Sequence, residues 1–204
     1  MPRKTFNGST NTTWRCPPNV YLVKAECWGI GGAGGNASVD FGGAGGGGSA
    51  YVEQVNIRVQ PGKAYIINLS GTVWFKSSVT VLAANGQVGG SPPDGGPAAS
   101  GGAGGLATNS IGLHTQSGSA GANGGAGGTP GAGGIGAPPY GGIADTAPGG
   151  GGSGDNPPNA AGFPGAAGRI TLTWYPRPRR PLRGVPSSRN FGGFFPFISP
   201  QHIG

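Results

Sequence analysis

A glycine- and proline-rich block in the middle of this chain constrains its fold more than any other feature. From Val88 to Gly168 the alternation of apolar and polar residues disappears, and residues 77–168 contain no lysine, arginine or glutamate. Strand-like sequence lies on both sides of the block, and residues 169–175 are the only such stretch that follows it. Because an isolated strand is unstable, this last stretch is expected to pair with strands that precede the block. The block is therefore predicted to be an insertion whose ends meet, not a linker between domains.

The insertion is predicted to fold, because structureless loops of this length are uncommon inside compact domains. Glycine and proline suit polyproline II, a helix with three residues per turn and no internal hydrogen bonds. When such helices pack side by side, the residue of each turn that faces a neighbour must be glycine. Glycines recur with this period in three runs: Gly118, Gly121, Gly124 and Gly127; Gly128, Gly131 and Gly134; Gly162, Gly165 and Gly168. The pattern favours a bundle of short polyglycine II-like segments, and a flexible glycine linker is the alternative.

The residues outside the block are typical of antiparallel strands around a common core. Strand-forming residues cover 20–28, 50–59, 64–69, 72–76, 79–82 and 169–175. Alternation within the second stretch places Tyr51, Glu53, Val55, Ile57 and Val59 on one face. The core is predicted to contain Trp28, Val55, Ile57, Val59, Ile67, Trp74, Ile170, Leu172 and Trp174.

These patterns predict an all-β fold class with an irregular glycine-rich region. A polar segment over residues 1–19 precedes a small antiparallel β-sandwich-like domain over residues 20–87 and 169–175. The polyglycine II-like insertion covers residues 88–168, and an extended tail covers residues 176–204.

The tail concentrates basic and aromatic residues. Its arginines are Arg177, Arg179, Arg180, Arg183 and Arg189, and they precede Phe191, Phe194, Phe195 and Phe197. Prolines between them prevent a helix. In one interpretation the tail is an extended anchor, in which arginines pair with acidic groups and phenylalanines fill an apolar groove of a partner. A solvated disordered tail and a tail that binds single-stranded nucleic acid are the alternatives. The clustered phenylalanines favour the anchor, because exposed aromatic groups promote aggregation.

No residue pattern indicates catalysis. The chain has two histidines, its aspartates lie far apart in turn-like sequence, and no cysteine–histidine spacing fits zinc. The glycine motifs are not followed by a helix and a lysine, so a phosphate-binding loop is not indicated. We therefore expect a non-enzymatic protein without a catalytic residue, cofactor or metal. Cys16 and Cys27 either form one bridge or remain reduced thiols.

Several stretches of the chain resemble the glycine-rich domain of bacteriophage virion proteins. Residues 17–35, PPNVYLVKAECWGIGGAGG, match its opening, in which a turn and a strand ending in tryptophan run into glycines. The stretches GGAGGGGSAYV, QPGKAYIINLSG and GAAGRITLTWY also fit, so that the resemblance covers about residues 17–175. Such domains occur in tail fibres and tip adhesins, where layered polyglycine II helices carry loops that contact the host. Here the glycine strings are shorter, and the basic, phenylalanine-rich tail is not part of that pattern.

The resemblance implies a structural protein of a tail fibre or baseplate that helps attachment to the host surface. Its expected partners are other virion proteins and a host cell-surface receptor, and assembly into a homo-oligomer, such as a trimer, is expected. Ile135 and Tyr140 are expected on the exposed face of the glycine block. A capsid decoration or head fibre is the main alternative, and an ice-binding protein or an RNA-binding tail protein is a weaker one.

The expected location is the virus particle. No stretch reaches the roughly 18 apolar residues of a membrane span, and the first residues do not resemble a secretory signal. We expect synthesis in the host cytoplasm without a signal peptide, and no membrane insertion. Binding of nucleic acid is not expected, because the formal net charge of +7 is confined to the two ends of the chain.

Overall fold

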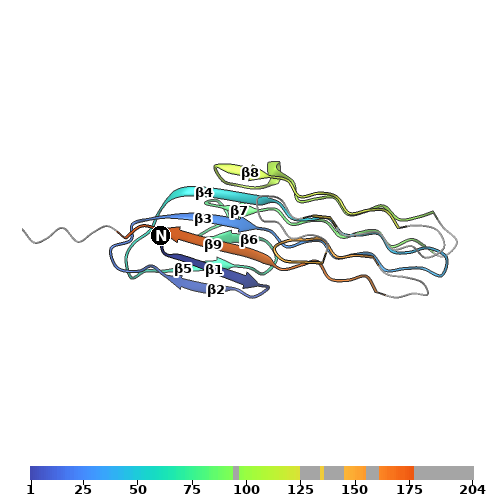
Figure 1. Ribbon diagram of the computed structural model, residues 1–204, viewed down its shortest axis with the longest axis horizontal. Helices are drawn as coiled ribbons and strands as arrows, with labels where there is room; N and C mark the ends of the chain where they lie inside the picture. The colour runs from blue at the N-terminus through green and yellow to red at the C-terminus, as the bar shows by residue number, and fades with distance from the viewer. Residues whose placement is uncertain (94–96, 125–133, 136–144, 155–160, 177–204) are drawn as a thin grey trace, which may run out of the picture.

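Two antiparallel sheets form one half of the molecule, and glycine-rich segments form the other half (Figure 1). The computed structural model describes residues 1–93, 97–124, 134–135, 145–154 and 161–176. The first sheet has the order β1 (Arg3–Gly8), β9 (Gly168–Trp174), β3 (Leu22–Trp28), β4 (Tyr51–Arg58) and β8 (His114–Gln116). The second has the order β2 (Thr12–Arg15), β5 (Ala64–Asn68), β6 (Val73–Phe75) and β7 (Leu82–Ala83). A single turn of 3₁₀-helix, η1 (Ala107–Asn109), precedes β8. The all-β antiparallel fold predicted from the sequence is confirmed.

The hydrophobic core lies between the two sheets. Alternate residues of each strand point inward, so β3 contributes Val23, Ala25 and Cys27. Aromatic rings close the core at its edge, where the Trp14 ring centroid lies 5.4 Å from that of Trp174. The predicted residues that the structure places in this core are Ile57, Val59, Ile67, Ile170, Leu172 and Trp174.

Three predicted core residues need correction. Val55 is half-buried and lies at a β-bulge, where the register between β3 and β4 shifts between Val23 and Ala25. The bulge reverses the alternation, so Val52 and Ile57 both face the core although they belong to different faces of a regular strand. Trp74 is half-buried, because its neighbours in β6 occupy the inward positions. Trp28 is buried, but it packs on Tyr51 outside the main core, with ring centroids 4.8 Å apart.

Residues 1–19 do not form a separate polar segment. β1 pairs with β9 in the first sheet, and β2 pairs with β5 in the second. Both strands lie at sheet edges, and most of their side chains are exposed and polar. Edge strands commonly carry such polar sequences, which is why apolar alternation failed to identify them. Trp14 enters the core, and Phe6 packs against it.

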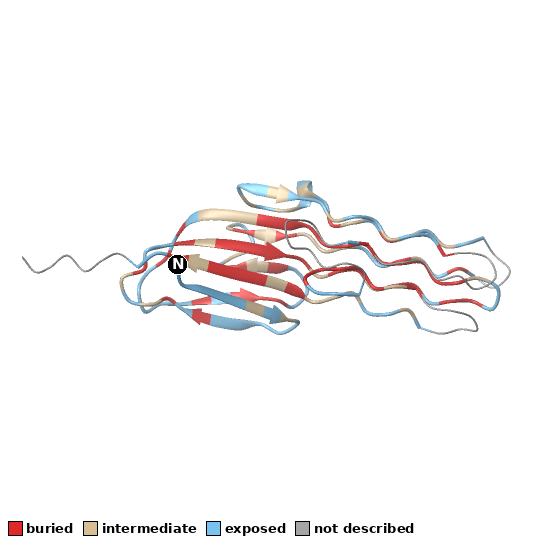
Figure 2. Ribbon diagram, viewed as in Figure 1, coloured by how far each residue is buried: buried red, intermediate tan, exposed pale blue. Residues whose placement is uncertain are grey.

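Glycine-rich segments of the chain run side by side beyond the sheets (Figure 1). We call them together the glycine bundle, which comprises residues 29–36, 42–50, 84–90, 99–105, 118–124, 134–135, 149–154 and 161–167. Figure 2 shows buried chain through the middle of this bundle and exposed residues along its outside. The bundle therefore has an interior, although that interior consists mainly of backbone.

The segment 42–50, which we call the central rod, forms the axis of the bundle. All nine of its residues are buried. Its backbone is hydrogen bonded to six other described segments, namely 29–36, 84–90, 99–105, 118–124, 134–135 and 149–154. Every N–H from residue 44 to residue 50 donates to one of these neighbours. The central rod thus satisfies its buried backbone donors without a sheet, as buried polar groups require.

The hydrogen bonds of the central rod repeat every three residues. The N–H groups of Ala44, Gly47 and Ala50 donate to residues 84–90, at distances of 2.9–3.1 Å. Those of Gly45 and Gly48 donate to residues 118–124, and those of Gly46 and Ser49 donate to residues 149–154. Since polyproline II has three residues per turn, we interpret the segments as polyglycine II-like.

Three strand pairings of the first sheet continue into the bundle without a change of register. Beyond the pair Trp28–Tyr51, the N–H of Gly29 donates to Ala50, and the N–H groups of Gly32 and Gly35 donate to Gly47 and Ala44. The pairings of β3 with β9 and of β4 with β8 are extended in the same manner, also in steps of three residues. The sheet therefore sets the alignment of the glycine segments.

The predicted insertion over residues 88–168 does not coincide with the bundle. Three segments of the bundle precede it, namely residues 29–36, the central rod and residues 84–87. All three lie within residues 20–87, which the sequence predicted to belong to the β-domain. Gly118, Gly121 and Gly124 of the predicted period-three runs face the central rod, because a Cβ at each would meet its carbonyl groups. Gly162 and Gly165 face residues 29–36 in the same way. Gly127, Gly128 and Gly131 lie outside the described residues.

The close packing of the central rod can be tested by replacing Gly46 with alanine. The added Cβ would lie within 3.0 Å of the carbonyl oxygens of Gly32 and Ala33. Backbone atoms cannot move aside as a flexible side chain can, so the free energy of unfolding should fall by about 2–3 kcal/mol. Chemical denaturation would measure the change.

Gly90→Ala is the matched control. The nearest atom to its Cβ would be the Ser100 carbonyl oxygen at 3.1 Å, and the residue is only half-buried. This contact is tight but is relieved by a shift of a few tenths of an ångström, so we expect a smaller loss than for Gly46→Ala, of about 1 kcal/mol. Equal losses in the two variants would contradict the proposed interior of the bundle.

The thiols of the two cysteines provide a second test of the fold. Cys16 and Cys27 are both free and buried, and burial raises the pKa of each thiol. Thiolate is the reactive form, so both should react with a thiol reagent much more slowly in the folded protein than in denaturant. Two thiols labelled after unfolding, with neither labelled before, is the expected result. A disulfide found in protein purified without oxidant would contradict it.

Candidate functional site

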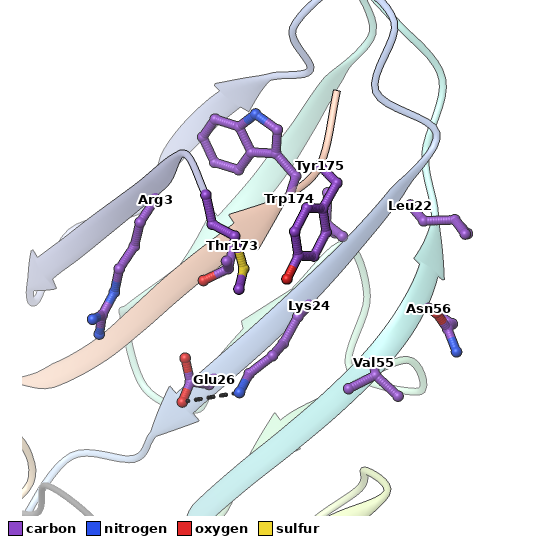
Figure 3. A pocket seen from close by; sticks show the side chains of 11 residues that line it. Arg3, Leu22, Lys24, Glu26, Val55, Asn56, Thr173, Trp174 and Tyr175 are labelled. Carbon is purple, nitrogen blue, oxygen red and sulfur yellow. Dashed lines mark ion pairs between the residues drawn. The ribbon is translucent and has the colours of Figure 1, made fainter. Parts of the chain in front are cut away.

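A groove opens on the outer face of the first sheet, at the end away from the glycine bundle (Figure 3). We call it the base groove, and its volume is about 610 Å³. Its lining residues are Met1, Arg3, Leu22, Val23, Lys24, Glu26, Val55, Asn56, Thr173, Trp174 and Tyr175. A volume of this size is typical of pockets that bind small molecules or a few side chains.

The bulge in β4 shapes one wall of the base groove. Asn56 adopts a positive φ of 56°, a conformation that asparagine enters more readily than most residues. With the extra residue opposite Lys24, Val55 turns to the outer face of the sheet. In Figure 3, Val55 and Asn56 stand on β4, across the groove from Arg3 and Thr173. A strand in phase with the core residues Ile57 and Val59 would have placed Val55 in the core, so this wall of the groove depends on the irregularity.

A network of polar side chains forms the floor of the groove and continues toward the bundle. Lys24 Nζ lies 2.6 Å from a carboxylate oxygen of Glu53 and 3.4 Å from one of Glu26. The Tyr51 hydroxyl lies 3.3 Å from both carboxylates and donates a hydrogen bond in this network. The single positive charge is thus shared between two carboxylates, and both carboxylates also lie within hydrogen-bond distance of the Tyr51 phenol.

The protonation equilibria of this network follow from these contacts. The hydrogen bond from Lys24 is the main reason that the pKa of Glu53 is lowered, and burial opposes the shift. For Lys24, burial alone would lower the pKa, but the two carboxylates together raise it. Burial, followed by the charge of Glu26, raises the pKa of Tyr51, so its hydroxyl stays protonated. These directions keep Lys24 charged, Glu53 ionised and the Tyr51 phenol neutral at neutral pH.

The walls of the base groove are largely apolar. Tyr175 and Leu22 are 65 % and 41 % exposed, and Met1 is exposed beside them. Leu22 also borders a second hollow, which is lined by Tyr21, Leu22, Arg58, Val59 and Gln60. Apolar surface therefore extends around this end of the β-domain. Such a surface can bind aromatic or aliphatic groups of a partner.

The predicted site residues are only partly covered by the structure. Ile135 is exposed, and its carbonyl accepts a hydrogen bond of 2.9 Å from the Ser119 N–H. Tyr140 lies outside the described residues, as do Arg177, Arg179, Arg180, Arg183, Arg189, Phe191, Phe194, Phe195 and Phe197. The tail that contains them begins directly after Tyr175 and Pro176, at the base groove.

Sequence reasoning missed the base groove and the network on its floor. The groove forms from four strands that are far apart in sequence, so no local motif marks it. The available signal was the pair of glutamates and one lysine in strands otherwise poor in charge. In the described part of the chain, no cluster of three histidine, cysteine or acidic side chains is placed to hold a metal ion. None of the helical residues described is part of a segment long and apolar enough to span a membrane.

No protein-family model matches the sequence, and no curated protein matches it either.

The ion pairs at the groove floor should make stability depend on pH. Because the pKa of Glu53 is lowered below its ordinary value of 4.5, its charged form stabilises the folded state at higher pH. This contribution is lost as the pH falls below 4.5. At pH 7, Glu53→Gln should lower the free energy of unfolding by up to about 1 kcal/mol, since Lys24 is partly exposed to solvent. Denaturation from pH 7 to pH 3 would measure the difference, which should shrink toward zero.

Asp40→Asn is the matched control, because Asp40 is an exposed carboxylate. It should change stability by less than about 0.5 kcal/mol at pH 7, as is usual for surface substitutions. A loss in Glu53→Gln that is the same at pH 7 and pH 3 would contradict the assignment.

Proposed function

We propose that this protein is a non-enzymatic structural component of a bacteriophage particle, located in a tail fibre or baseplate. In this proposal the tail beyond Pro176 anchors the chain to other virion proteins. The glycine bundle points away from the particle and helps attachment to the host surface. The protein is made in the host cytoplasm and assembles on the particle, as a homo-oligomer.

The observation that carries the proposal is the polarity of the molecule. β9 runs away from the glycine bundle and ends at Trp174, at the opposite end of the β-domain, two residues before the tail begins at Pro176 (Figure 1). A tail bound to a particle would therefore leave the far end of the bundle directed outward. An anchor at one end and an exposed segment at the other suit a protein that attaches a particle to a host surface.

The construction of the bundle also supports the proposal. At its far end, residues 37–41 form a loop between residues 29–36 and the central rod, in which the Ser38 N–H donates to the Phe41 carbonyl. Loops on a rigid scaffold are a common location for binding residues, because the scaffold limits the positions that they adopt. Small side chains on the outside of the bundle, such as Ala122 and Asn123, leave room for neighbouring copies.

Removal of residues 177–204 tests the anchor. In the phage that encodes the protein, we expect purified particles to contain at least about tenfold less of the truncated protein, because buried arginine and phenylalanine contacts contribute well over 1.4 kcal/mol. Quantitative mass spectrometry of particles separated by density would measure incorporation. Removal of residues 198–204 alone, which keeps the arginines and phenylalanines, is the control and should leave incorporation unchanged.

Immunogold labelling of complete particles tests the location. Label on the tail is the expected result, whereas label spread over the capsid would indicate a decoration protein instead. Normal incorporation of the truncated protein would overturn the anchor.

A further inference from the structure

The base groove is an apolar surface that no described segment of the chain covers. Leu22, Val55 and Tyr175 form its walls, and all three side chains are at least partly exposed. Figure 3 shows the Tyr175 ring lying between β9 and β3, with Lys24 and Glu26 paired below it. An exposed hollow of this kind marks a binding surface more often than it marks unused surface.

The charges in the groove favour an apolar occupant. Lys24 is already engaged by Glu26 and Glu53, and the Tyr51 hydroxyl donates to the same carboxylates, so each charged group of the floor already has a partner. Arg3 is the other charged side chain in the lining, and it would repel an arginine-rich segment. Aromatic side chains, each of which buries about 150–250 Å² of surface, suit such a site.

The chain itself carries a segment with this chemistry close to the groove. Four phenylalanines lie within residues 191–197, and the tail leaves the described structure at Pro176, next to Tyr175. The first of these phenylalanines, Phe191, lies 15 residues after Pro176. Such a tether reaches up to about 50 Å when extended, so the segment can return to the groove without strain. A short tether also gives an effective concentration on the order of millimolar.

We propose that the base groove binds the phenylalanine-rich segment, residues 191–197, of the same chain. The phenylalanine rings pack against Leu22, Val55 and Tyr175, and the arginines between them and Pro176 stay at the surface. In the free protein this contact covers the apolar groove and the apolar tail together. A partner that binds the tail must then displace it from the groove. The contact stands whether or not the protein belongs to a phage particle.

Photocrosslinking in the full-length chain tests this contact. A photoreactive benzoylphenylalanine replaces Phe195, and mass spectrometry identifies the residues to which it attaches after irradiation. We expect attachment to the segments that line the groove, residues 1–3, 22–26, 55–56 and 173–175. Attachment elsewhere on the protein, or none, would overturn the proposal.

Substitutions on the two outer faces of the sandwich provide the matched comparison. Leu22→Asp and Tyr175→Ser change exposed groove residues and should each lower the crosslink yield by about tenfold. Ile66→Asp changes a side chain of β5 that is 49 % exposed, outside the groove, and should leave the yield unchanged. An equal fall in all three variants, or no fall in the groove variants, would count against the groove.

Mixing isotopically heavy and light protein distinguishes the chain's own tail from that of a second copy. Crosslinks that join peptides of the same isotopic mass support binding within one chain. Crosslinks between heavy and light peptides would overturn it in favour of exchange between copies. Loss of virion incorporation in the truncated protein is a separate measurement, so either proposal can fail alone.

Discussion

Backbone hydrogen bonds between closely packed glycine segments hold the distal half of this protein together. They form only where the side chains between neighbouring segments are absent or small, and the central rod therefore contains glycine, alanine and serine alone. Glycine loses more conformational entropy on folding than any other residue and buries no side chain. The bundle offsets this loss by pairing the backbone donors of its buried centre with neighbours on all sides.

The β-sandwich makes such a bundle feasible because it aligns the segments before they pack. The hydrophobic core holds β3, β4 and β9 together, and the glycine segments continue these strands in the same register. At the boundary the repeat changes from two residues to three, since a strand presents two faces and a polyproline II-like helix presents three. The conformational cost of ordering glycine is thus met in part by strands whose own stability comes from apolar burial.

The two ends of the molecule differ in chemistry. The base carries the charged and aromatic side chains, including the Lys24 network and the walls of the base groove. The bundle is almost uncharged and presents mainly small side chains, although Val88, Ile135 and Phe163 are exposed on it. The apolar groove lies at the base, whereas the far end of the described structure offers the loop of residues 37–41. This division agrees with the proposed roles of anchoring and attachment.

Much of the fold was predictable because its signals are local. Alternation identified β9, the last strand of the first sheet in chain order, and the period of three in glycine identified residues 118–124 as part of a bundle. The edge strand β1 was not predictable, because its side chains are mostly polar and its pairing partner lies at the other end of the chain. The positions of Val55 and Trp74 were misjudged, since a bulge and the order of inward residues in a three-residue strand depend on neighbouring strands.

The sequence by itself determined that this protein is all-β and that its basic excess lies at the two ends of the chain, and it favoured a glycine-rich part that packs backbone against backbone. Composition and period decide these properties, because they depend on the size and alternation of single residues. Only the tertiary structure decided which glycine segment lies at the centre, where the register shifts, and that a groove opens beside the start of the tail. These features arise between segments that are distant in sequence, and long-range hydrogen bonds and packing select them.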